Sequence, residues 1–126
     1  MEEKTLSFMQ LTVWQKAHEF VLKVYKLTAN FPKHEIFSLS MQFRRAAVSI
    51  AANIAEGYIK RTKPDKVKFF NISQGSLEEC RYYTLLSKDL QYILINDYEI
   101  LNTLSSDISK LLTSYIKKIQ NDYTQK

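Results

Sequence analysis

The sequence predicts an all-α protein built as an antiparallel up-down four-helix bundle. Apolar residues recur at three- and four-residue spacing along four long segments, which is the pattern of amphipathic helices. Two glycines and two prolines in 126 residues are too few for the many tight turns of a β-sandwich or barrel. The segments between the helices are short, and short connections favour antiparallel neighbours. This length corresponds to one domain, which we expect to span residues 1–126.

The first helix is expected over residues 11–29. Asn30-Phe31-Pro32 should end it, because the residue before a proline disfavours helical angles and proline itself lacks an amide hydrogen. The apolar stripe of this helix consists of Leu11, Trp14, Ala17, Val21, Val24 and Leu27.

The second helix is expected over residues 39–57, and it is apolar around much of its circumference. Ser38 or Ser40 is placed to cap its start, and Gly57 predicts a left-handed stop at its end. Such a helix belongs in the interior of a bundle or in a subunit interface. Many of its residues are small and allow neighbouring helices to approach closely: Ala46, Ala47, Ser49, Ala51, Ala52 and Ala55.

The third helix is expected over residues 63–90. Thr62 is a suitable N-cap, with Asp65 three residues further on, and Pro64 is tolerated in a first turn. Gly75 lies inside this helix, where glycine costs about 1 kcal/mol relative to alanine. It indicates either close helix packing or a chance occurrence.

The fourth helix is expected over residues 96–120, with Asn96 and Glu99 forming a capping box at its start. Residues 121–126 should fray. Together the four apolar stripes predict a bundle core that includes Trp14, Ile50, Ile54, Leu77, Leu104 and Leu111.

No residue pattern in the chain corresponds to an active site, so we expect no catalytic residue, no metal and no cofactor. The two histidines, His18 and His34, lack the Glu-x-x-His or His-x-x-x-His spacing of metal-binding helices. The single cysteine, Cys80, lies on an apolar helical face, where a buried inert thiol is more common than a nucleophile. The sequence therefore predicts a non-enzymatic protein.

The net charge of +5 is concentrated in the central third of the chain. Residues 33–68 carry +5, residues 1–32 carry +1 and residues 69–126 carry −1. This asymmetry indicates an anionic partner such as RNA or DNA, and a solvated surface that keeps the protein soluble is the alternative. The candidate nucleic-acid-binding residues are Arg44, Arg45, Lys60, Arg61, Lys63, Lys66 and Lys68.

Four polar residues lie along one line of the otherwise apolar second helix. They follow i, i+4, i+8, i+11 spacing, and they are Arg45, Ser49, Asn53 and Glu56. A solvent-facing stripe fits this pattern, and so does a seam that faces another subunit or a ligand. In the second case the arginines would pair with an acid such as Glu79, and these residues would form an interface.

The start of the chain carries no evident targeting signal. Met1-Glu2-Glu3-Lys4 has acids where a secretory signal has bases, and no apolar stretch follows. No segment approaches the roughly 20 apolar residues of a membrane span. We therefore expect a cytoplasmic protein without a membrane partner.

The run from Phe43 to Tyr58, FRRAAVSIAANIAEGY, resembles the signature of the four-helix-bundle family known as 23S rRNA intervening-sequence proteins. The resemblance covers roughly residues 10–120. Three positions depart from the family pattern: Ala51 replaces a usual proline, Ile59 a common glycine, and Gln91 a glycine that often ends the third helix. Supporting matches are Leu11-Thr12-Val13-Trp14-Gln15-Lys16-Ala17, Phe31-Pro32, and Gly75-Ser76-Leu77 with Glu79.

The resemblance implies a bacterial cytoplasmic protein, sometimes encoded within insertions in 23S rRNA genes. Family members are distantly similar to the accessory proteins of diversity-generating retroelements, which are basic pentameric barrels that bind nucleic acid and a reverse transcriptase. By this analogy the chain would form a homo-oligomer, for example a pentamer, that binds RNA or DNA on a basic surface with little sequence preference. A structural or protein-interaction oligomer, with a protein partner and no nucleic acid, is the alternative.

Overall fold

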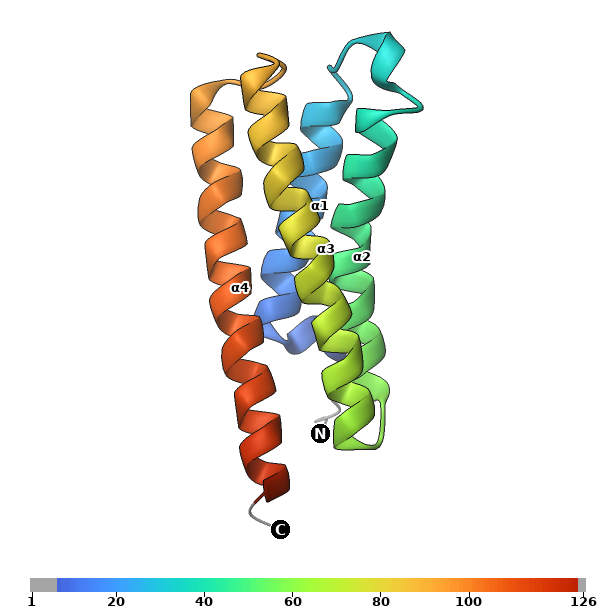
Figure 1. The fold of residues 1–126 in the computed structure, drawn as a ribbon, viewed down its shortest axis with the longest axis vertical. Coiled ribbons are helices and arrows are strands. Elements are labelled where there is room, and N and C mark those ends of the chain that lie inside the picture. The colour runs from blue at the N-terminus through green and yellow to red at the C-terminus, as the bar shows by residue number, and fades with distance from the viewer. Residues whose placement is uncertain (1–6, 125–126) are drawn as a thin grey trace.

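Four α-helices run up and down along one long axis in the computed structural model (Figure 1). It describes residues 7–124, with side chains through residue 121. The helices are α1 Thr12–Thr28, α2 Leu39–Ile59, α3 Lys63–Asp89 and α4 Ile95–Thr124, and two short 3-10 helices are η1 Phe8–Gln10 and η2 Lys33–Glu35. No strand occurs between residues 7 and 124, so the predicted all-α fold is confirmed.

Each long helix packs against two others in a square arrangement. The backbones of α1 and α3 each lie close to those of α2 and α4, whereas the backbones of the diagonal pairs lie farther apart within the described residues. The contact between α2 and α3 is the most extensive. The connection between α2 and α3 lies at the same end of the bundle as the end of α4 (Figure 1).

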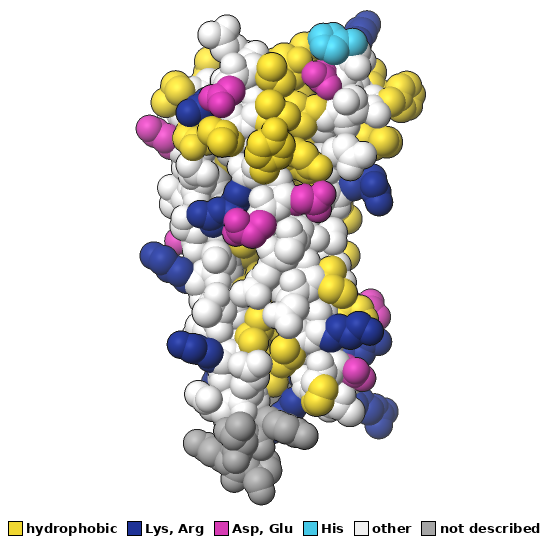
Figure 2. Space-filling view, viewed as in Figure 1, with side chains coloured by type: hydrophobic (Ala, Val, Ile, Leu, Met, Phe, Trp, Pro, Cys, Tyr) yellow, Lys and Arg dark blue, Asp and Glu magenta, His cyan; other side chains and the backbone are white. Residues whose placement is uncertain are grey.

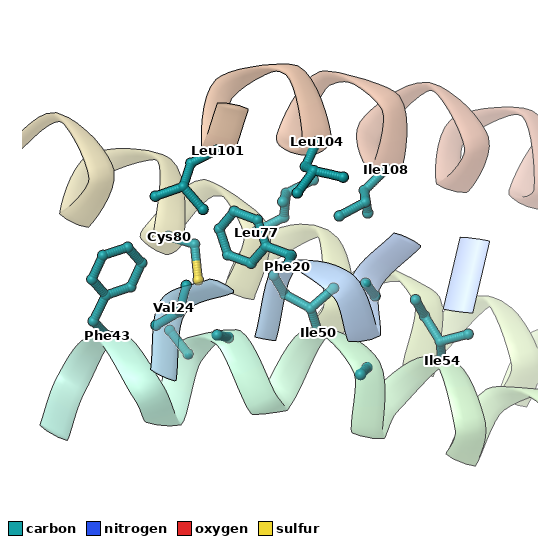
Figure 3. Packing of buried hydrophobic residues seen from close by; sticks show 14 of the residues in the cluster. Phe20, Val24, Phe43, Ile50, Ile54, Leu77, Cys80, Leu101, Leu104 and Ile108 are labelled. Atoms are coloured by element: carbon teal, nitrogen blue, oxygen red, sulfur yellow. The ribbon is translucent and has the colours of Figure 1, made fainter. Parts of the chain in front are cut away.

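Apolar side chains from all four helices fill the interior. Figure 3 shows them pointing inward between the ribbons. Trp14 and Leu111, which were among the predicted core residues, are only partly buried. The Trp14 ring stacks on His18, with ring centroids 4.9 Å apart, and meets Phe8 edge-on at 5.1 Å. The predicted core residues that are buried are Ile50, Ile54, Leu77 and Leu104.

Small polar side chains join α2 to α3 inside their contact. The hydroxyl of Ser73 is buried and donates a hydrogen bond to the carbonyl oxygen of Ile50 at 2.8 Å. The hydroxyls of Ser49 and Ser76 are hydrogen-bonded to each other at 2.7 Å. Because these side chains are short, they satisfy their polar groups without holding the two backbones apart.

Gly57 has a packing role, and the predicted left-handed stop at this residue is wrong. α2 continues through Gly57 to Ile59, and no described glycine has a positive φ angle. A Cβ atom at this position would lie 2.7 Å from Cε1 of the buried Phe70 ring, so the close approach requires glycine. A Cβ at Gly75 would meet nothing within 4 Å, which favours the chance alternative there.

The start of α2 is capped by an acid from η2. The amide of Leu39 donates to Oε1 of Glu35 at 3.2 Å, and the side chain of Ser38 makes no capping hydrogen bond. The hydroxyl of Tyr92 also donates to this carboxylate, at 2.8 Å. The hydrogen bonds from Tyr92 and then Leu39 hold the pKa of Glu35 below its ordinary value.

The start of α4 also differs from the predicted cap. The helix begins at Ile95, and the carbonyl of Leu94 accepts from the amide of Tyr98 at 3.0 Å. Asn96 therefore lies inside the helix, and the predicted capping box is wrong. α4 extends to Thr124, beyond the helix end predicted at residue 120.

Gln91 ends the α3 region in a left-handed backbone conformation, with a φ angle of 64°. Its amide donates to the carbonyl of Lys88, and the amide of Tyr92 donates to the carbonyl of Ser87, both at 2.9 Å. Paired bonds of this kind close a helix end and favour glycine at the left-handed position. The departure from the family pattern at this residue therefore places a side chain in a strained conformation.

Candidate nucleic-acid interface

One end of the bundle gathers basic side chains from two separate parts of the chain. We define this basic end as residues 56–68 and 110–121. The first stretch holds five bases and two acids and the second three bases and no acid, so together they carry +6, against +5 for the whole chain. Figure 2 shows Lys and Arg side chains along both edges of the lower half of the molecule.

The antiparallel pairing of α3 and α4 brings these two stretches together. The rings of Phe70 and Tyr115 lie 5.1 Å apart between centroids, and Gln74 donates to the hydroxyl of Thr113 at 3.3 Å. The first turns of α3 therefore lie beside the last turns of α4. The partial positive charge of the α3 N-terminus adds to the side-chain charges at this end.

The connection between α2 and α3 is fixed by a helix cap. The hydroxyl of Thr62 accepts from the amide of Asp65 at 3.2 Å, and Pro64 lies in the first turn, as predicted. This sharp start of α3 leaves Arg61 exposed at the tip, while Lys63 is half-buried. The local sequence thus directs the tip arginine toward solvent.

Lys60 and Lys68 lie over the ring of Phe69. The ammonium of Lys60 is 4.9 Å and that of Lys68 5.9 Å from the ring centroid. Lys60 also lies 3.4 Å from the carboxylate of Glu56, one helical turn earlier. Both ammonium groups are near the surface, and Lys68 is exposed.

Lys66 has a structural role at this end. Its ammonium donates to the carbonyl of Tyr58 at 2.7 Å and to that of Gly57 at 3.3 Å. These are carbonyls of the last turn of α2, where a cation is favourable to the helix dipole. Burial lowers the pKa of Lys66. Lys66, which the sequence suggested as a phosphate-binding residue, is therefore hydrogen-bonded to backbone carbonyls of its own chain.

Arg44 and Arg45 do not join the basic end. They precede Lys60 by about 16 residues in one helix, which separates them by roughly 24 Å. The guanidinium of Arg44 donates to the hydroxyl of Thr28 at 2.7 Å and lies 4.6 Å from the Tyr25 ring centroid. The structure thus divides the candidate nucleic-acid-binding residues into two groups.

Ser49 joins the predicted polar seam to α3 of the same chain. Asn53 donates to the backbone carbonyl of Ser49 at 2.9 Å and to its hydroxyl at 3.0 Å. Ser49 in turn bonds Ser76, as described above. Arg45 and Glu79 line a polar recess of about 150 Å³ at the outer edge of this contact. Glu56, the last member of the seam, lies beside Lys60 instead.

Tyr83, next to this recess, interacts with Glu79. The hydroxyl of Tyr83 donates to Glu79 at 3.2 Å. Burial and the neighbouring Glu79 carboxylate raise the pKa of Tyr83. No group of three or more His, Cys, Asp or Glu side chains that could hold a metal ion occurs among the described residues.

A large apolar groove lies between α2, η2 and the end of α1, and it shares Arg45 and Ser49 with the polar recess. We call it the α1–α2 groove. Its volume is about 950 Å³, and its lining includes Phe37, which is 84% exposed, and Ile36, which is 50% exposed. A second recess of about 280 Å³ shares Val48 and Ala52 with it and extends the apolar surface to Trp14.

Three lysines of the basic end were not among the sequence-predicted candidates: Lys110, Lys117 and Lys118. All three are exposed on the second half of α4. Two signals in the sequence point to them. No acid occurs between Asp107 and Asp122, and the end of the fourth helix must lie beside the start of the third in an up-down bundle.

Fold and surface together define a small four-helix bundle with one basic end and an exposed apolar groove. None of its helices, within residues 7–124, has the length and apolar character needed to cross a membrane.

The model of the 23S rRNA-intervening sequence protein family matches residues 9–114, and the chain belongs to this family. This confirms the resemblance seen in the helix-2 run. A crystal structure of a protein of unknown function from the S23 ribosomal protein family of Bacteroides thetaiotaomicron is similar, with 32% sequence identity and a TM-score of 0.78. The match covers 84% of this chain and 99% of that one. No curated protein matches the chain.

Proposed function

We propose that this chain is a non-enzymatic protein of the bacterial cytoplasm that binds RNA or DNA through the basic end. The observation that carries this proposal is the concentration of +6 in residues 56–68 and 110–121, with Arg61 and the α4 lysines exposed. Lys and Arg side chains neutralise backbone phosphates and release condensed counterions. Phosphate contacts carry no direct sequence information, so little sequence preference is expected.

The binding partner should be held by charge, and affinity should fall steeply with salt. About three to five phosphate contacts per subunit would give a log–log salt slope of roughly −2 to −4. Electrophoretic mobility shifts with RNA and DNA probes at two salt concentrations test this directly. Absence of any shift at low salt would refute the proposal.

Charge reversal tests whether the basic end is the binding surface. The double variant Arg61→Glu, Lys117→Glu should weaken binding to all probes about equally and make the salt slope shallower. The matched control is Lys26→Glu, Lys33→Glu, which makes the same change in net charge on exposed residues of the opposite end. Equal losses in the two double variants would indicate an effect of net charge alone. Circular dichroism should show unchanged helicity in both.

We further propose that the chain assembles into a closed homo-oligomer, with the pentamer of the retroelement accessory proteins as the analogous state. Two different apolar surfaces support head-to-tail contact, which closes into a ring when the rotation permits. One is the α1–α2 groove. The other would draw on the exposed apolar side chains of α3 and α4, such as Tyr82, 58% exposed, and Ile95, 61% exposed. A ring would repeat the basic end and raise the avidity for a long nucleic acid.

Light scattering and native mass spectrometry test the assembly. Phe37→Ser should dissociate the oligomer if the groove is the contact, whereas Ile59→Ser, at a 69% exposed apolar residue of the basic end, should leave it intact. A stable monomer at micromolar concentration in the wild type would refute the assembly. Arg45→Glu should weaken it only if the rim of the groove takes part.

A protein-interaction role is the second candidate, and the exposed groove favours it. A contiguous apolar surface with Phe37 at its edge is typical of protein contact sites. If the wild-type chain binds no nucleic acid at low salt but still forms an oligomer, this role takes first place.

A further inference from the structure

Phe69 directly follows the first stretch of the basic end and does not belong to the bundle core. Its neighbour Phe70 is fully buried and packs on Tyr115. Phe69 is half-buried and lies outside the core cluster and the residues packed against it. Core packing therefore does not explain why an aromatic residue occupies this position.

Lysine side chains cover the Phe69 ring. The ammonium groups of Lys60 and Lys68 lie 4.9 and 5.9 Å from its centroid. Cation–π contacts at exposed sites are weak, and lysine side chains are long and flexible. Phosphate groups can draw both ammonium groups away, which uncovers the flat ring between two newly formed charge contacts.

The chemistry of this tip suits unpaired nucleotides. Aromatic rings beside basic groups stack with bases in proteins that bind single strands, and this stacking tolerates any base. A duplex keeps its bases stacked inside and offers the ring nothing. Exposed Arg61 and the 69% exposed Ile59 extend the same mixed surface of charge and apolar area.

We propose that the basic end prefers single-stranded nucleic acid, with one unpaired base stacked on Phe69 and the flanking phosphates held by Lys60 and Lys68. This inference rests on the proposed function and narrows its ligand class. An anionic lipid surface also attracts basic and apolar groups, but a bilayer is met by projecting side chains. The half-buried ring of Phe69 lies beneath its lysines instead.

Fluorescence anisotropy with three labelled probes of equal length tests the stacking. The probes are a single strand, an abasic strand with the same phosphates, and a duplex. The wild type should bind the single strand at least about fivefold more tightly than the abasic strand. Phe69→Leu, which keeps an apolar side chain without the aromatic face, should remove that difference and leave abasic binding unchanged. The control Phe37→Leu makes the same change on an exposed residue of the opposite end and should alter neither.

Each outcome separates the two proposals. Equal binding of the single and abasic strands, an unchanged Phe69→Leu variant, or a preference for the duplex would overturn the stacking and leave charge-driven binding intact. Failure to bind all three probes at low salt would overturn both. Binding to phosphatidylserine vesicles that exceeds binding to the single strand would also overturn the inference, because it would assign the tip to lipid.

Discussion

Gly57 and Gly75 differ in how closely their helices are packed. Replacing each with alanine should therefore change the free energy of unfolding in opposite directions. Both glycines lie inside helices with ordinary helical backbone. Alanine is favoured over glycine in a helix interior by about 0.8–1.0 kcal/mol. Gly75→Ala adds a methyl group to open space, so it should gain this amount.

Gly57→Ala should gain the same helix propensity and lose more. The new methyl carbon would lie 2.7 Å from the Phe70 ring, which is fully buried and packed on Tyr115. Inserting a methyl into a packed core costs about 1–3 kcal/mol. The propensity gain is common to both variants, so Gly57→Ala should be about 1–3 kcal/mol less stable than Gly75→Ala.

Urea unfolding followed by circular dichroism, at one fixed protein concentration, measures this difference. In thermal unfolding of a chain of this size, 1 kcal/mol corresponds to roughly 3–5 °C in Tm. In a Phe70→Leu background the clash should be relieved, so Gly57→Ala should become neutral or stabilising there. If Gly57→Ala stabilises the wild type as much as Gly75→Ala does, the ring moves freely and the reasoning is wrong.

Three further substitutions and one labelling experiment test other parts of the structure. Ile50→Ala should cost about 2–5 kcal/mol, because the side chain is fully buried, and unchanged thermal stability would contradict the core assignment. Gln91→Gly should add about 1 kcal/mol by relieving the left-handed strain, and a lower Tm would contradict it. Burial raises the pKa of the Cys80 thiol, so a disulfide reagent at pH 8 should label only the unfolded chain. Tyr92→Phe should raise the pKa of Glu35 in an NMR titration; the stabilisation that it removes is present at pH 7 and disappears as the pH falls through the lowered pKa.

Helix existence followed from the sequence more reliably than helix ends. Apolar periodicity predicted all four helices, because burying one stripe is a property of the whole segment. The ends depend on contacts between elements. Gly57 indicated a stop by local rules, but the ring of Phe70 explains why glycine stands there. The cap of α2 comes from Glu35, whose position is fixed partly by Tyr92 from far along the chain.

The candidate site was predictable only in part, because charge was counted along the chain and acts in space. The central basic third correctly included Arg61 and Lys60 among the bases of one end. It also included Arg44, which lies in the same third of the sequence. In the structure Arg44 is far from Lys60 along α2 and is hydrogen-bonded to Thr28. The charge count missed the α4 lysines, because acids that precede them bring the net charge of residues 69–126 to −1.

The position of Trp14 gives the protein an optical reporter of its own. It is the only tryptophan in the chain, and it borders the recess that continues the α1–α2 groove. The colour of indole emission depends on access of water to the ring. Any molecule or second subunit that covers this side of the bundle should therefore shift the emission to the blue, without a label and without altering a residue.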